Sequence, residues 1–123
     1  MRVLIISIII LAVLITGTVC NTIYMDNLTN KMLNIIANLP EQSNPNGDVS
    51  AIDELSYMWE KNSHFVAISA GSDYITDISA ALTETREFYL SEYNAHYKCA
   101  HAKLYRAVCR LHELERFSLD NII

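Results

Sequence analysis

The chain has 123 residues, 51% of them hydrophobic, and its 14 acidic and 9 basic residues give a net charge of -5. A chain of this length supports one domain at most. Its 3 Gly and 2 Pro residues exclude collagen-like, linker-like and most turn-rich all-β proteins. The acidic balance, without a large basic block, indicates that nucleic acid is not a partner.

The N-terminal segment is almost purely apolar. Residues 1–20 contain 15 hydrophobic residues and a single charge, Arg2. As a helix, Val3–Cys20 would be about 27 Å long, close to the roughly 30 Å core of a bilayer. The sequence therefore predicts a transmembrane anchor over residues 1–24 and a helical domain over residues 25–123.

Two other fates of the apolar segment stay open at this point. A cleaved signal peptide needs small residues at the first and third positions before the cut, and Thr18 with Cys20 matches this pattern poorly. A lipoprotein would be acylated at Cys20, but Val19 stands where a small residue is expected. We therefore favour a retained anchor over a cleaved signal, and a cleaved signal over a lipoprotein.

The charges that flank the apolar segment predict its orientation. Arg2 precedes the segment, the next basic residue is Lys31, and Asp26 lies between. The positive-inside rule then predicts a cytoplasmic N-terminus. We expect a single-pass protein of the cell membrane whose residues 25–123 are extracytoplasmic.

An amphipathic pattern continues beyond the anchor, with an apolar residue at every third or fourth position. Pro40 ends this helix, and Pro45–Asp48 is typical of a turn. The apolar positions of this stretch are Leu28, Met32, Ile35 or Ile36, and Leu39.

A second helix is predicted from Ser50, where Ser50 and Asp53 have the spacing of a capping box. Gly71 is a natural left-handed C-cap, and Ser72 or Asp73 can cap the helix that follows. The apolar stripe of the second helix is Ile52, Leu55, Trp59, Val66 and Ala70.

The stretch from Tyr74 to Ile123 contains neither Gly nor Pro. Its apolar stripe steps by three or four residues, and steps of four through the tyrosines interrupt the heptad rhythm. One long helix or two helices with a break around Ser91–Asn94 both fit. Helical spacing favours boundary packing for Tyr89, Tyr93 and Tyr97. The predicted fold is all-α: a transmembrane helix, then a small antiparallel hairpin or bundle with a long C-terminal helix.

Basic residues concentrate in the last 28 residues of the chain. They could form a surface for phosphate or anionic lipid. We favour ion pairs across the bundle with Asp53, Glu54 and Glu60, because these bases are sparse for a binding patch. The basic residues in question are Lys98, Lys103, Arg106 and Arg110.

Two His/Cys pairs have the spacing of metal ligands on a helix face, namely His96 with Cys99 and Cys109 with His112. The pairs lie about 15 Å apart along a continuous helix. One metal could bind both pairs only between two copies of the chain. The same distance excludes a disulfide between Cys99 and Cys109.

Motifs for catalysis are missing from the sequence. It contains no GxSxG motif and no glycine-rich phosphate loop. The neighbours of His64, His96, His101 and His112 do not suggest a catalytic triad. We expect no enzyme activity, no catalytic residues, and no bound cofactor or metal.

Trp59, the long uninterrupted C-terminal helix and the tail Phe117–Ile122 carry a resemblance. The chain resembles a small bacterial family known as domain-of-unknown-function family 4363. Members combine an N-terminal membrane segment, a central Trp and a Ser-Leu-x-Asn-Ile ending. The matching positions are Trp59, Leu119, Asn121 and Ile122.

This resemblance implies a membrane location, a helical architecture and a spore-forming Gram-positive source, but no activity. The family often has a His about a dozen residues after the Trp, where this chain has Gly71–Asp73.

These observations predict a membrane-anchored, non-catalytic helical protein that acts through contacts with a protein partner, with itself or with the envelope. A secreted helical protein, formed by signal cleavage, is one alternative. A metal- or redox-linked dimer through His96, Cys99, Cys109 and His112 is another.

Overall fold

The structure, a computed structural model, describes residues 1–122 and the side chains of residues 1–114. Over these residues the chain forms four helices and no strand, so the all-α prediction is confirmed. The helices are α1 (Arg2–Ala37), α2 (Ser50–Ala70), α3 (Ser72–Tyr89) and α4 (Asn94–Ile122).

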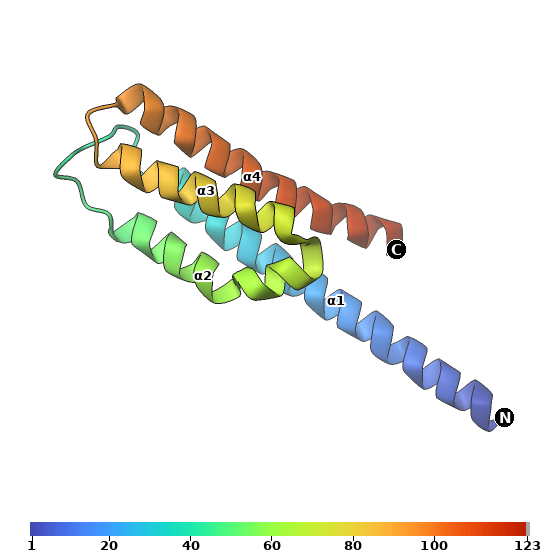
Figure 1. Cartoon of the computed structure of the whole chain (residues 1–123). Coiled ribbons are helices and arrows are strands. Elements are labelled where there is room, and N and C mark those ends of the chain that lie inside the picture. The colour runs from blue at the N-terminus through green and yellow to red at the C-terminus, as the bar shows by residue number, and fades with distance from the viewer. Residues whose placement is uncertain (123) are drawn as a thin grey trace.

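The four helices form an antiparallel bundle (Figure 1). Helix α1 lies against α2 and α4, and α3 lies against the same two helices, so that α2 and α4 are diagonal to each other. The short connections between α2 and α3 and between α3 and α4 favour this arrangement, because they return each helix beside the one before it. The N-terminal half of α1 leaves the bundle and extends beyond it (Figure 1).

The predicted apolar stripes line the interior of the bundle. A Leu, Ile or Met side chain removed from water in this way contributes about 1.5–3 kcal/mol. Tyr93 is an exception among the predicted positions, with an exposed fraction of 65%. The large side chains with less than 2% exposure include Met25, Met32, Ile36, Ile52, Leu55, Val66, Ile78, Tyr97, Leu104, Val108 and Leu111.

The helical stretch after Tyr74 is broken between α3 and α4, which decides between the two predicted alternatives. Ser91 stabilises the turn between the two helices. Its hydroxyl donates to the Phe88 carbonyl (2.6 Å) and accepts from the Tyr93 amide (3.1 Å). Serine competes with helical hydrogen bonding in this way. The reversal brings Tyr89 of α3 and Tyr97 of α4 together, with 5.4 Å between ring centroids.

The loop between α1 and α2 covers this closed end of the bundle. The Asn44 amide donates to the Tyr89 carbonyl (2.7 Å), which satisfies one of the last carbonyls of α3. The Tyr97 hydroxyl donates to the Pro40 carbonyl. Gly47 lies so close to the Tyr89 ring that a Cβ atom at this position would overlap it. These contacts hold the loop against the end of the bundle opposite to the free half of α1.

The predicted capping box at the start of α2 is wrong. Helix α2 begins at Ser50 without a side-chain cap of its own, and the Asp48 carboxylate accepts from the Ser50 amide at 2.9 Å. Hydrogen bonds from the Ser50 backbone first, and then from its side chain, hold the pKa of the Asp48 carboxyl below its usual value. Asp53 instead contacts Arg86 on α3 (3.1 Å).

The connection between α2 and α3 is a single residue, Gly71. Its φ of 102° confirms the predicted need for glycine, but its ψ of 162° lies outside the left-handed helical region that we expected. Only glycine adopts this conformation readily. Ser72 and Asp73 are inside α3 and do not cap it, so that part of the prediction is wrong.

Candidate functional site

The most distinctive surface of the molecule is the N-terminal half of α1. The helix is long and apolar enough to cross a membrane, and none of its most apolar window is buried against the bundle. Its large side chains from Val3 to Ile15 are 49–78% exposed. Soluble monomers rarely expose apolar patches of more than a few hundred Å². By length and composition, the helix that carries this segment is a candidate membrane span.

The hydroxyl groups within this segment are satisfied by the helix itself. An unsatisfied polar group in hydrocarbon costs several kcal/mol, and internal bonding avoids that cost. The hydroxyls of Ser7, Thr16 and Thr18 donate to the carbonyls of Val3 (2.8 Å), Ala12 (2.8 Å) and Leu14 (2.9 Å).

Helix α1 continues from the free segment into the bundle without a break. The Ser69 hydroxyl of α2 donates to Asn21 Oδ1 at 2.8 Å, directly after the apolar run. One turn further on, the Tyr24 hydroxyl donates to Asn62 Oδ1, and the Tyr24 ring meets Phe65 edge-on with 4.6 Å between centroids. Side-chain contacts therefore hold α2 against α1 directly after the apolar run ends.

Exposed apolar side chains gather around this junction, and the sequence prediction did not select them. Their exposed fractions are 86% for Ile68, 57% for Ile23, 41% for Phe65 and 38% for Tyr24. Phe65 and Ile68 lie off the core stripe of α2, near the end of that helix. Apolar residues off the stripe and beside a turn were the signal that could have identified them.

Two histidines of α4 bond to α1. His112 Nδ1 lies 2.8 Å from Thr29 Oγ1 and 3.4 Å from an Asp26 carboxylate oxygen. His101 Nε2 lies 2.8 Å from the Ile36 carbonyl, where an Nε2–H group satisfies one of the last carbonyls of α1. Both contacts join α1 to α4.

The proposed metal ligands are not brought together within one copy of the chain. The His96 ring contacts the rings of Phe88 and Tyr93, with centroid distances of 5.1 and 5.6 Å. Cys99 is exposed and Cys109 half-buried, both as free thiols. Among the described residues, no three His, Cys, Asp or Glu side chains gather as metal ligands.

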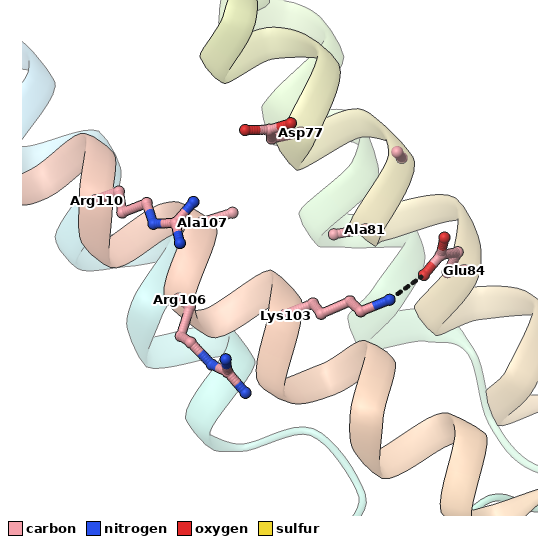
Figure 2. A pocket seen from close by; sticks show the side chains of 8 residues that line it. Asp77, Ala81, Glu84, Lys103, Arg106, Ala107 and Arg110 are labelled. Atoms are coloured by element: carbon pink, nitrogen blue, oxygen red, sulfur yellow. Dashed lines mark ion pairs between the residues drawn. The ribbon is translucent and has the colours of Figure 1, made fainter.

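Three bases of α4, Lys103, Arg106 and Arg110, line a groove with acidic residues of α3 and not of α2, whereas Lys98 lies with Glu41 beside a separate pocket. Lys103 Nζ lies 3.8 Å from a Glu84 carboxylate oxygen, across a groove of about 250 Å³ between the two helices. Figure 2 shows the Asp77 carboxylate on the same wall as Glu84, facing the helix that carries Arg110. The expected pairing with Asp53, Glu54 and Glu60 is wrong because α2 is diagonal to α4.

The acidic wall of this groove also weakens the case for an anion site. Asp77 and Glu84 repel a phosphate that Arg106 or Arg110 would attract. The volume is below the roughly 300–1,000 Å³ of pockets that hold drug-sized ligands. We therefore interpret the groove as a charged contact line between α3 and α4 and not as a ligand site.

The chain matches no protein-family model, no curated protein and no solved structure. Trp59, which carries part of the family resemblance, is 2% exposed, and its Nε1 donates to Ser79 Oγ at 2.9 Å. These are the contacts of a core residue. The side chains of Leu119, Asn121 and Ile122, which carry the rest, lie outside the described residues.

Proposed function

We propose that the chain is a single-pass membrane protein that presents a helical bundle outside the cell and acts by contact, without catalysis. The observation that carries the proposal is the unbroken helix α1, half of which is core of the bundle and half an exposed apolar rod. A rod of this length and composition fits a bilayer.

The partner of the bundle would be a membrane protein, a second copy of the chain or the cell envelope. Contact is the favoured mode of action because His101 and His112, which could serve in acid–base chemistry, are engaged in joining α1 to α4. The relationship with domain-of-unknown-function family 4363 belongs to the same proposal. It supports location and architecture and assigns no activity.

Alkaline carbonate extraction of membranes tests the anchor. We expect the full chain in the membrane pellet, and a larger fraction of a Leu11→Asp variant in the soluble wash, since a central acid costs about 2.5–3.5 kcal/mol in a membrane helix. A matched Tyr57→Asp variant, changed at a residue of α2 that is 67% exposed, should stay in the pellet.

Full-length wild-type chain in the wash would contradict the anchor. Sequencing of the mature N-terminus supplies the second readout. A chain that starts near Asn21 would show that the apolar segment is a cleaved signal and that the bundle is secreted.

Thiol labelling of intact cells tests the orientation. In a chain with Cys20→Ser and Cys109→Ser, Cys99 is the only thiol, and its exposure removes burial as an explanation for failure to label. A membrane-impermeant maleimide should react with Cys99 in intact cells. Reaction only after lysis would place the bundle in the cytoplasm.

A further inference from the structure

The connection between α2 and α3 lies at the end of the bundle from which the apolar half of α1 emerges (Figure 1). The hydrogen bond between Ser69 and Asn21 fixes the relative height of α2 and α1 there. Because the two helices are antiparallel with equal rise per residue, Gly71, two residues after Ser69, is level with Val19, two residues before Asn21. The turn therefore lies beside the last part of the apolar run.

The length of the apolar run places the end of α2, just before this turn, at the bilayer boundary. A hydrocarbon core of about 30 Å needs about 20 helical residues, so a span that starts at Val3 ends near Thr22. Ile68, one residue before Ser69, is level with Thr22. The end of α2 would therefore reach the outer surface of the membrane that α1 spans.

The side chains at this height are unusually apolar for an exposed surface. At 86%, Ile68 has the largest exposed fraction among the large hydrophobic side chains of residues 16–114. Ile23, Tyr24 and Phe65 adjoin the junction and are also exposed. Tyr24 has the amphipathic ring that is enriched where helices leave a membrane.

We propose that Ile68 and Phe65 of α2, with Ile23 and Tyr24 of α1, form a second membrane contact that inserts into the outer interface of the bilayer. This inference rests on the proposed anchor. The occupant is lipid because the patch directly follows the apolar run of α1 and lies at the height of the bilayer boundary. The contact would hold the bundle at a fixed height and tilt.

The contact is apolar in character, not electrostatic. The nearest charged groups of the first turn of α3 and of α1 beyond the junction are acidic, Asp73 and Asp26. They would not attract anionic headgroups. Insertion should therefore occur in a neutral phosphatidylcholine bilayer and should not change with salt.

Spin labels on the full chain in phosphatidylcholine vesicles test this contact. The three native cysteines, Cys20, Cys99 and Cys109, are replaced by Ser, and one new cysteine is introduced as Ile68→Cys, Tyr57→Cys or Leu11→Cys. Tyr57 is the matched control, because it is an exposed residue of the same helix about 16 Å farther from the turn. The collision rates of each label with oxygen and with a water-soluble nickel chelate are measured.

We expect the oxygen-to-nickel ratio at position 68 to exceed that at position 57 several-fold and to approach that at position 11. An aqueous ratio at position 68 with a lipid ratio at position 11 would overturn the second contact and leave the anchor intact. An aqueous ratio at position 11 would refute the anchor as well. Shielding of position 68 from both reagents would show a protein contact instead and also overturn the proposal.

Discussion

Replacing Tyr97 by Phe would remove a single hydroxyl group from the closed end of the bundle. The Tyr97 side chain is 1% exposed, and its hydroxyl donates to the Pro40 carbonyl in the loop that covers this end. A neutral hydrogen bond of this kind contributes about 1 kcal/mol. Near neutral pH we expect Tyr97→Phe to lower the free energy of unfolding by about that amount.

The difference should change sign in alkaline solution. Burial first, and then the neighbouring Tyr89, raise the pKa of Tyr97 from 10.0 to about 12. The folded state keeps a proton that the unfolded chain releases, so the contribution of Tyr97 to wild-type stability is intact below about pH 10 and is lost between about pH 10 and 12. At about pH 11.5 the loss is about 2 kcal/mol, since each pKa unit corresponds to about 1.4 kcal/mol. Phe has no such proton, so the Tyr97→Phe variant should then be the more stable protein by about 1 kcal/mol.

Guanidinium unfolding of the full chain in mild detergent, followed by circular dichroism at a series of pH values, measures this difference. The stability curves of wild type and Tyr97→Phe should cross between about pH 10 and 11. Tyr57→Phe is the control, because Tyr57 is 67% exposed and its variant should run parallel to wild type. Parallel curves for Tyr97→Phe would refute the assignment of a buried, neutral Tyr97.

Four further substitutions are compared by the same unfolding measurement. Leu104 is fully buried, so Leu104→Ala should cost about 2–5 kcal/mol. Leu11→Ala, in the free half of α1, should cost less than about 0.5 kcal/mol; equal costs would mean that the two sites are not core and surface. Ser79→Ala leaves the Trp59 Nε1–H without its acceptor and should cost about 1 kcal/mol, with unfolding followed by the fluorescence of this only Trp; an unchanged midpoint would argue against the bond. Asp53→Asn breaks an exposed ion pair and should change stability by less than about 1 kcal/mol, whereas a larger loss would mean that the pair is not solvated.

The helical stripes could be predicted because helical periodicity is a local property of the chain. Leu55, Trp59 and Val66 fall on one face of α2 whatever that helix packs against. The break before Asn94 left only a weak mark, a change of spacing among tyrosines. The structure shows that Ser91 stabilises this break, because its hydroxyl bonds to the backbone of its own turn. Such a bond competes with the hydrogen bonds of a helix, and the spacing of apolar residues does not reveal it.

The partners of charged side chains could not be predicted, since they depend on which helices are neighbours. Lys103 was expected to face acids of α2 but contacts Glu84 of α3. Asp53 was expected to cap α2 but contacts Arg86. In both cases the order of helices around the bundle, set by the burial of all four apolar faces together, selected the partner.

The sequence by itself determined the apolar run from Val3 to Cys20, because the fitness of a helix for a bilayer depends only on its length and composition. Only the tertiary structure showed that this run and the core residues of α1 belong to one unbroken helix. It also decided that Ile68, 46 residues after Thr22 in the chain, lies level with it. That height follows from the lengths of α1 and α2 and from the contact of Ser69 with Asn21, which are long-range consequences of packing.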